Sequence, residues 1–304
     1  MKAVSVRELA ERFSMKVLAG HEQLSREITK TRVHRPGLEF VGYFDFFPQQ
    51  HVQVLGKKEI TYLHKMTDDE RRARISNIVK YHPPCFVVAG DFGEMKYFPK
   101  FCEEEGIPLL LTEMPALKFQ ELADGYLSKM LAPEIALHGV CINVAGIGIL
   151  LRGKSGVGKS ETAHTLIRRG HRLVADDIVV LKKINPEVLL GTHDGKNREF
   201  LALRSIGLIN VSRLYGRTAF QDETRIVLDI ELTKWQNESL LYNDLELAPQ
   251  FTEYLGVQIP HMEIQLQPGR DVAGLVEAVA HNWYLRQEGY SAAEEFMKRL
   301  ESDV

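Results

Sequence analysis

Residues 140–177 read VCINVAGIGILLRGKSGVGKSETAHTLIRRGHRLVADD, and this stretch decides the fold of the C-terminal half of the chain. Within it, GKSGVGKS at residues 153–160 fits the phosphate-loop pattern G-x-x-x-x-G-K-S/T. An apolar run precedes the pattern and a helical segment follows it, as a strand–loop–helix unit requires. This context argues against a glycine-rich turn that matches by accident.

The residue types in this loop suit the binding of a polyphosphate. Glycines let the backbone turn so that successive N–H groups point at phosphate oxygens, and the next helix adds its own free N–H groups. Lys159 supplies a positive charge for the β- and γ-phosphates, and the Ser160 hydroxyl is a ligand for Mg²⁺. We therefore predict a nucleotide site made by Gly153, Lys154, Ser155, Gly156, Val157, Gly158, Lys159 and Ser160.

Two adjacent carboxylates, Asp176 and Asp177, follow one helix and one strand later. Adjacent residues of a strand point to opposite sides, so one carboxylate can serve the metal with Ser160 while the other faces an acceptor hydroxyl. An aspartate near that hydroxyl can take its proton as the phosphoryl group leaves ATP. The plain alternative is a pair of turn aspartates at a strand end; the neighbouring phosphate loop favours the functional interpretation. His138, on its spacing alone, is an ordinary surface or core histidine.

The pattern around this stretch predicts two α/β domains, 1–132 and 133–304, with the boundary at Ala132-Pro133. In the first, an S-x-x-E capping box at Ser5 and Glu8 starts a helix. Further elements there are strands at 51–55, 85–89 and 107–111 and helices at 97–105 and 119–131, which indicates a small α/β domain with some parallel pairing. In the second, we predict strands at 140–144, 147–151, 172–175, 178–181 and 225–232, and helices at 159–169, 272–286 and 292–300.

Composition excludes several classes of protein. The 304 residues are 44% hydrophobic and 26% charged, and the net charge of −3 provides no basic field for nucleic acid or an anionic membrane. A basic cluster at residues 168–172 follows the helix of the phosphate loop and is interpreted as complementing its dipole. Three scattered cysteines without a C-x-x-C pair argue against a disulfide scaffold or a zinc site. With no signal peptide and no apolar run of about 20 residues, we expect a cytoplasmic protein.

Several motifs in a fixed order resemble the HPr kinase/phosphorylase family. In the C-terminal half they are HGV at 138–140, GIG at 146–148, the phosphate loop, RGHRLVADD at 169–177 and RSIGLINV at 204–211; RPG at 35–37, LGK at 55–57 and PGR at 268–270 extend the match over nearly the whole chain. The resemblance implies a bacterial cytoplasmic enzyme, usually a homohexamer, whose C-terminal domain is similar to the phosphoenolpyruvate carboxykinase core. It implies phosphorylation of a serine on the phosphocarrier protein HPr with ATP or pyrophosphate and Mg²⁺, and removal of that phosphate by phosphorolysis, which links sugar transport to carbon metabolism.

The resemblance also implies roles for single residues. Asp177 would be general base for the kinase and general acid for the reverse reaction, because the serine oxygen is nucleophile in one direction and leaving group in the other. Lys159 would hold the transferred phosphoryl group, Ser160 the Mg²⁺, and His138 matches a catalytic histidine of the family. Residues 201–210 match the family signature, and residues 265–270 match a loop tied to dephosphorylation.

This chain departs from the family pattern at four positions. Ala202 stands where a metal-serving Glu is usual, Ser205 replaces a glycine, Asp244 stands in place of a catalytic Arg, and Gln267 replaces an often basic residue. A methyl group cannot bind Mg²⁺, and an anion repels transition-state charge that an arginine would stabilise. We name Glu199 and Glu223 as carboxylates that would compensate. Two alternatives stay open: a kinase of this fold with another substrate, and a nucleotide-binding regulator with weak or no turnover.

Overall fold

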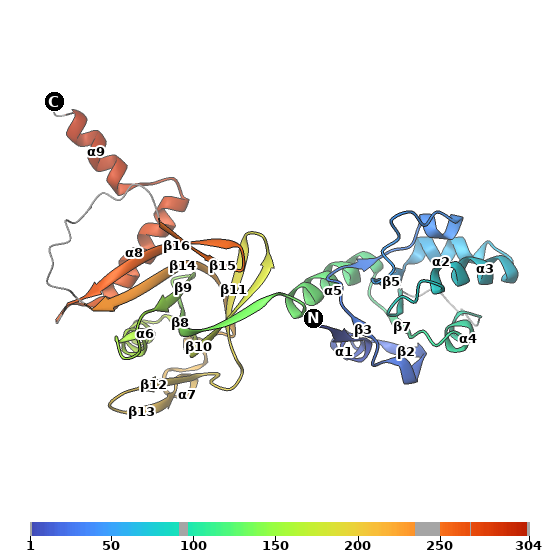
Figure 1. The fold of residues 1–304 in the computed structure, drawn as a ribbon, viewed down its shortest axis with the longest axis horizontal. Coiled ribbons are helices and arrows are strands. Elements are labelled where there is room, and N and C mark those ends of the chain that lie inside the picture. The colour runs from blue at the N-terminus through green and yellow to red at the C-terminus, as the bar shows by residue number, and fades with distance from the viewer. Residues whose placement is uncertain (1, 91–96, 235–249, 268, 303–304) are drawn as a thin grey trace. The chain divides into compact units, whose positions relative to one another are not determined.

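The computed structural model describes residues 2–90, 97–234, 250–267 and 269–302 of the protein. The chain divides into two compact units, Met1–Ala132 and Pro133–Val304 (Figure 1). Both units are mixed α/β, and each is built around a sheet. No helix of the described part is both long and apolar enough to cross a bilayer.

The first unit has a five-stranded sheet in the order β2-β7-β6-β5-β4, in which β4 to β7 are parallel and β2 is antiparallel to β7. A two-stranded sheet pairs β1 with β3. The strands are β1 (Val4–Ser5), β2 (Lys16–Ala19), β3 (Glu27–Ile28), β4 (Val33–His34), β5 (Val52–Leu55), β6 (Phe86–Ala89) and β7 (Leu109–Thr112). The helices are α1 (Val6–Arg12), α2 (Lys57–His64), α3 (Asp68–Val79), α4 (Tyr97–Glu104) and α5 (Ala116–Met130), with short 3-10 turns at His21–Gln23 and Leu38–Val41.

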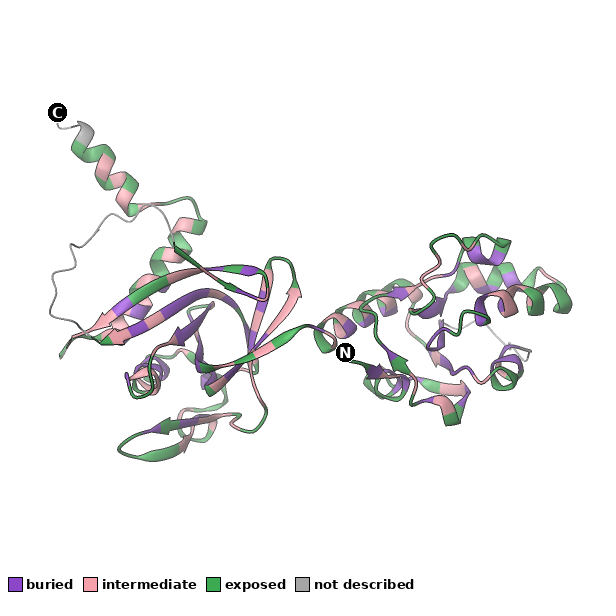
Figure 2. Cartoon of the chain, in the orientation of Figure 1, coloured by how far each residue is buried: buried purple, intermediate pink, exposed green. Residues whose placement is uncertain are grey.

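Helices cover both faces of this sheet, because alternate strand residues point to opposite sides. Val54 and Val87 face one core, which includes residues of α1 and α5. Leu55 and Phe86 face the other, which includes residues of α2, α3 and α4. The parallel strands are therefore buried on both faces, as Figure 2 shows.

The second unit has a seven-stranded sheet in the order β11-β10-β8-β9-β14-β16-β15, with β9, β14 and β16 parallel. Its strands are β8 (Glu134–Val144), β9 (Ile147–Arg152), β10 (Arg172–Asn185), β11 (Val188–His193), β14 (Glu223–Lys234), β15 (Gln250–Tyr254) and β16 (Val257–Leu266). A separate hairpin joins β12 (Phe200–Leu203) and β13 (Gly207–Asn210). The helices are α6 (Lys159–Arg168), α7 (Val211–Tyr215), α8 (Val272–Gln287) and α9 (Ala292–Ser302), with a 3-10 turn at Arg217–Ala219.

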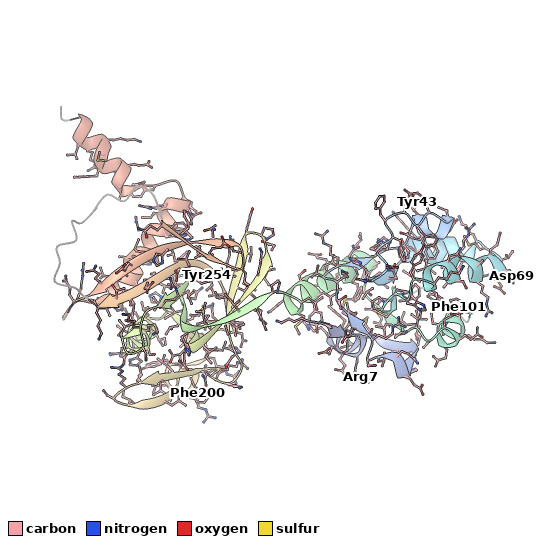
Figure 3. The ribbon with its side chains drawn as sticks, in the orientation of Figure 1. Arg7, Tyr43, Asp69, Phe101, Phe200 and Tyr254 are labelled. Atoms are coloured by element: carbon pink, nitrogen blue, oxygen red, sulfur yellow. The ribbon has the colours of Figure 1, made fainter. Side chains whose placement is uncertain are left out.

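Strand β11 also pairs with β14, so β11, β10, β8, β9 and β14 close a ring of paired strands. Side chains such as Cys141 and Leu150 form one core with Tyr254, which Figure 3 labels on β15. The alternate residues Ile142 and Leu151 face a second core, which includes residues of α6, α8 and the β12–β13 hairpin. This second core holds α6, and with it the loop at its start, against the sheet.

Most of the predicted elements are confirmed, including the capping box at Ser5 and the turn between β8 and β9. The prediction of two short strands at 172–175 and 178–181 is wrong, because β10 runs without a break from Arg172 to Asn185. Asp176 and Asp177 therefore lie inside a strand that pairs with β8 rather than at a strand end. The basic cluster makes tertiary ion pairs: Arg169 contacts Asp271 and Glu277 on the α8 side.

Candidate active site

The phosphate loop occupies residues 153–158, between the end of β9 and the start of α6. Gly153, Gly156 and Gly158 have φ values of 134°, 77° and 109°, which L side chains rarely adopt. A Cβ at Gly153 would overlap the carbonyl oxygen of Leu232, so the loop also needs glycine for its close approach to β14. Gly158 caps α6 without a side-chain hydrogen bond, which leaves the first-turn N–H groups of the helix available to an anion.

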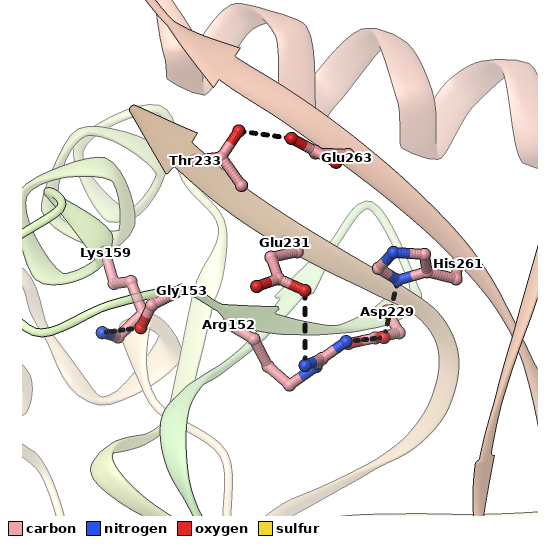
Figure 4. Close-up of polar contacts among 8 residues, drawn as sticks. All are labelled: Arg152, Gly153, Lys159, Asp229, Glu231, Thr233, His261 and Glu263. Atoms are coloured by element: carbon pink, nitrogen blue, oxygen red, sulfur yellow. Dashed lines mark hydrogen bonds and ion pairs between the residues drawn. The ribbon is translucent and has the colours of Figure 1, made fainter. Parts of the chain in front are cut away.

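The side chain of Lys159 folds back over this loop and binds its backbone. Its Nζ donates to the carbonyl oxygen of Gly153 at 2.9 Å (Figure 4) and to that of Lys154 at 3.3 Å. The ammonium group therefore lies at the mouth of the loop, where phosphates would approach the N-terminus of α6. Val157 is buried and packs into the core, so it anchors the loop rather than contacting a ligand.

A hydrogen-bonded pair beside the loop joins the buried Asp176 to the half-buried Ser160. Ser160 Oγ donates to Asp176 Oδ1 at 2.9 Å, and the backbone N–H of Ala202 donates to Oδ2 at 3.0 Å. Burial raises the pKa of Asp176, whereas these hydrogen bonds act in the opposite direction. A hydroxyl and a carboxylate oxygen are hard ligands of the kind that Mg²⁺ takes when phosphates and waters supply the rest. The described residues contain no group of three or more His, Cys, Asp or Glu side chains that could hold a metal by themselves.

Asp177 and His138 form a second, exposed pair on the same cavity. His138 Nδ1 lies 3.4 Å from Asp177 Oδ1 and 3.2 Å from the Asp177 backbone oxygen. Asp177 has a φ of 70°, a conformation that costs an L residue on the order of 1 kcal/mol or more. Neighbouring carboxylates thus differ in setting: Asp176 is buried against Ser160, and the side chain of Asp177 is 64% exposed beside His138.

These groups surround one cavity of about 630 Å³. Its lining includes every predicted site residue except Lys154 and Val157. It also includes residues that the sequence did not identify as site residues: Gly139, Glu161, Asn197, Phe200, Arg204 and Leu208. Phe200 and Leu208 belong to the β12–β13 hairpin, where Figure 3 labels Phe200. The family signature at 201–210 marks this hairpin in the sequence, but only the fold brings it over the phosphate loop.

Arg204 brings a second cation to the loop. A Cβ at Gly156 would overlap its guanidinium group, so the arginine lies directly against the loop backbone. Its position in the turn between β12 and β13 explains the contact, because this hairpin packs beside α6. A planar guanidinium group is well suited to phosphate oxygens.

The unusual residues of the chain have different fates in the structure. Ala202 lines the cavity and offers its backbone N–H to Asp176, but it has no side-chain oxygen. Glu199 and Glu223 do not line the cavity, so neither replaces a carboxylate there; Glu161 is the lining glutamate. Residues 243–247, which include Asp244, and residue 268 of the loop at 265–270 lie outside the described residues. Gln267 is described and does not line the cavity.

A buried ionic cluster supports the start of the phosphate loop (Figure 4). The carboxylate of Asp229, on β14, is fully buried and accepts from Arg152 Nε at 2.7 Å and from Nη2 at 2.6 Å. His261 Nδ1 on β16 lies 2.9 Å from the same carboxylate, and Glu231 lies 3.5 Å from Arg152. The hydrogen bonds that Arg152 donates to the Asp229 carboxylate raise the pKa of Arg152. Since Arg152 directly precedes Gly153, this cluster ties the loop to the centre of the sheet.

Comparisons with known proteins agree along the whole chain. A family model described as "HPr Serine kinase C-terminal domain" matches residues 129–300, and "HPr Serine kinase N terminus" matches residues 4–127. A protein of Oceanobacillus iheyensis, "Putative HPr kinase/phosphorylase 2", is 62% identical over 301 residues, which cover 99% of this chain and 98% of that protein. The "HPr kinase/phosphorylase" of Caldanaerobacter subterraneus subsp. tengcongensis is 37% identical over 300 residues, with 99% and 98% covered. The solved "Structure of the Hpr(Ser) kinase/phosphatase from Coxiella burnetii" is 31% identical, covers 53% of this chain and 98% of that one, and has a TM-score of 0.48.

Proposed function

This chain belongs to the HPr kinase/phosphorylase family, and we propose that its cavity at the phosphate loop performs both directions of the reaction on a serine of HPr. The proposal rests on one observation: the groups that phosphoryl transfer needs all surround one cavity of about 630 Å³. These groups are the loop amides, Lys159, the Ser160–Asp176 pair and the Asp177–His138 pair. Such a site can bind a polyphosphate and place a base near it, which is what phosphoryl transfer requires.

In the kinase direction, the residues of this chain divide the work. The loop amides, Lys159 and Arg204 would hold the phosphates, and the exposed Asp177 would take the proton of the serine hydroxyl. The serine oxygen forms a bond to the γ-phosphorus while the bond to the β-phosphate oxygen breaks. His138, within 3.4 Å of Asp177, would orient that carboxylate. Mg²⁺ bound by Ser160 and Asp176 would supply charge neutralisation on the phosphate oxygens.

In the reverse direction, inorganic phosphate would occupy the loop and attack the phosphorus of phosphoserine. The serine oxygen leaves and takes the proton from Asp177, and pyrophosphate forms. The same carboxylate can serve both reactions, because the serine oxygen is the nucleophile in one and the leaving group in the other, so its proton is taken up or returned at the same place. An exposed carboxylate suits this task, since a protein serine must reach it from solvent.

Further properties belong to the same proposal. We expect a cytoplasmic homohexamer that uses ATP or pyrophosphate, with a C-terminal unit similar to the phosphoenolpyruvate carboxykinase core. The family resemblance supports these properties. The phosphate loop lies between strand β9 of a mixed sheet and helix α6, and this arrangement also supports the similarity to the phosphoenolpyruvate carboxykinase core.

One observation favours a second candidate, a nucleotide-binding regulator with slow turnover. Ala202 lies on the cavity wall where the family pattern places a metal-serving carboxylate, and neither Glu199 nor Glu223 lines the cavity. With fewer oxygen ligands, the metal would be held less firmly and transfer would slow, while the loop would still bind nucleotide.

A two-way transfer assay separates these candidates. Purified HPr is incubated with the protein, Mg²⁺ and ATP, and phosphoserine-HPr is incubated with the protein and inorganic phosphate. We expect both reactions, and Lys159→Ala should slow each on the order of 10²-fold or more, because a charge that stabilises the transition state is lost. Lys298→Ala, an exposed lysine on α9 outside the cavity, is the matched control. Nucleotide binding by calorimetry without any transfer would replace the enzyme proposal by the regulator.

A further inference from the structure

We propose that the first unit, residues 1–132, contains a second ligand site that binds a small organic phosphate. The site is a cavity of about 850 Å³, whose lining includes the basic residues Arg35, Lys57, Lys58 and Lys65 and the apolar residues Tyr62 and Leu117. All of these residues belong to the first unit, so the cavity is separate from the phosphate loop. The inference is independent of the function proposed above.

The topology of the sheet places this cavity where ligands usually bind. Strands β4, β5, β6 and β7 are parallel, so their carboxyl ends lie at one edge. The lining residues Arg35, Gly90 and Glu113 each follow directly after the end of β4, β6 or β7, and Lys57 comes two residues after the end of β5. Open parallel α/β sheets bind their ligands outside the carboxyl ends of the strands.

The charges of the lining favour an anion. Arg35, Lys57, Lys58 and Lys65 are basic, and Glu113 is the one acidic residue among the lining residues. None of the three lysines has an ion-pair partner within residues that the structure describes. Lys57 and Lys58 also occupy the first turn of α2, where the helix dipole disfavours cations. This placement costs stability in the free protein and becomes favourable when an anion binds above the turn.

Arg35 adds a directional donor at the base of the cavity. Its Nη2 donates to both carboxylate oxygens of Glu59, at 3.0 and 2.9 Å, which fixes the guanidinium plane. Its Nε is buried and has no hydrogen-bond partner among the described residues. A buried donor without an acceptor is unfavourable, and a small shift of the guanidinium group on ligand binding would let an oxyanion in the cavity supply the acceptor. Gly56 leaves room for this arrangement, because a Cβ there would lie 2.7 Å from the Cβ of Ala116 and 3.0 Å from Arg35 Nη2.

The opposite side of the cavity is apolar, which favours an organic ligand over inorganic phosphate. Tyr62 and Leu117 line it and remain 38% and 72% exposed. Pro115 and Ala116 continue this wall at the start of α5. An aromatic ring beside basic side chains can bind the body of a ligand while the cations bind its phosphate.

Calorimetric titration of the full-length chain tests the site, with phenyl phosphate as the probe. The chain carries Lys159→Ala, which weakens phosphate binding at the other unit. We expect saturable binding of phenyl phosphate that Lys57→Ala/Lys58→Ala weakens at least tenfold. Lys16→Ala/Lys30→Ala removes the same charge from exposed positions of the first unit outside the cavity and should leave the affinity unchanged.

Two comparisons make the test decisive. Inorganic phosphate should bind more weakly than phenyl phosphate, because it gains nothing from Tyr62 and Leu117; equal affinities would overturn the assignment to an organic ligand. Circular dichroism checks that each variant is folded. Absence of phenyl phosphate binding, or binding that is the same in both double variants, would overturn the site itself.

Discussion

Replacing Asp229 by alanine should destabilise the second unit substantially. The carboxylate is fully buried, accepts two hydrogen bonds from Arg152 at 2.7 and 2.6 Å, and lies 2.9 Å from His261. Breaking a buried ion pair by removing one partner costs about 3–5 kcal/mol, because the other charge stays buried without compensation. Arg152 is 25% exposed and keeps Glu231 at 3.5 Å, so we expect a loss near the lower end, about 3 kcal/mol.

Urea unfolding followed by tryptophan fluorescence reports this loss of stability in the second unit, residues 133–304. Both tryptophans, Trp235 and Trp283, belong to residues 133–304, and Trp283, on α8, packs against the core of that unit. For a unit of this size, about 3 kcal/mol corresponds to a fall of roughly 6–12 °C in Tm. Glu231→Ala is the matched control on the same strand; it removes a longer, partly exposed contact and should cost less than about 1 kcal/mol.

A double variant separates lost pairing from lost volume. Arg152→Met/Asp229→Leu removes both charges and should be less destabilised than Asp229→Ala, because no uncompensated guanidinium remains. If Asp229→Ala cost no more than Glu231→Ala, the ionic cluster would not hold the loop as we argue. A double variant as unstable as the single one would show that packing, not charge, dominates at this position.

Three further predictions concern the site and its surroundings. Asp177→Gly should relieve the strain of the positive φ, so the free energy of unfolding should stay the same or rise by roughly 1 kcal/mol while phosphoryl transfer is abolished. Asp177→Asn should also be inactive. Transfer to HPr by either variant would refute the role of Asp177 as base. Burial raises the pKa of Asp176. As the pH is lowered, Mg²⁺ affinity in the presence of nucleotide should therefore begin to fall at a higher pH than it would with an ordinary aspartate as ligand. Asp176→Asn should remove this pH dependence, and an unchanged pH profile in that variant would contradict the prediction. Burial acts to raise the pKa of Glu277, but the hydrogen bonds from His171 and Arg169 outweigh it and lower the pKa. The contact therefore contributes its full stability above the pKa of an unfolded glutamate, about 4.3, and this contribution is lost as the pH falls through the lower pKa of Glu277 in the folded protein. In urea unfolding, Glu277→Gln should lose less stability than wild type between about pH 6 and pH 3. Equal losses would exclude the contact as a source of acid sensitivity.

The order of elements around the phosphate loop could be predicted from sequence, because its signals are local. Apolar runs, the Ala145-Gly146 turn and the glycines of residues 153–158 act over a few residues and require no partner from elsewhere. The strand, loop and helix follow in the structure as expected. Capping at Ser5 and Glu8 is likewise a contact within one turn.

The prediction of a strand break at Asp176 and Asp177 was wrong because two acids interrupt an apolar pattern there. Pairing with β8 continues β10 through both positions, and Asp176 finds hydrogen bonds from Ser160 and the N–H of Ala202. These partners offset the cost of burying a carboxylate. The sequence pattern shows the acidic residues but not their partners, and so it predicts a break in the strand. The hairpin that provides Ala202 was not predicted at all.

The sequence by itself determined the chemistry of the loop and its place between a strand and a helix, since both depend on residue types within one short segment. Only the tertiary structure decided what lies opposite that loop: Arg204 against Gly156, and the Arg152–Asp229–His261 cluster beneath it. Arg152 and Asp229 are 77 residues apart, and Asp229 and His261 are 32 apart. Contacts of this range are set by strand pairing and by packing of the whole core, and these give no periodic signal in the segments that they join.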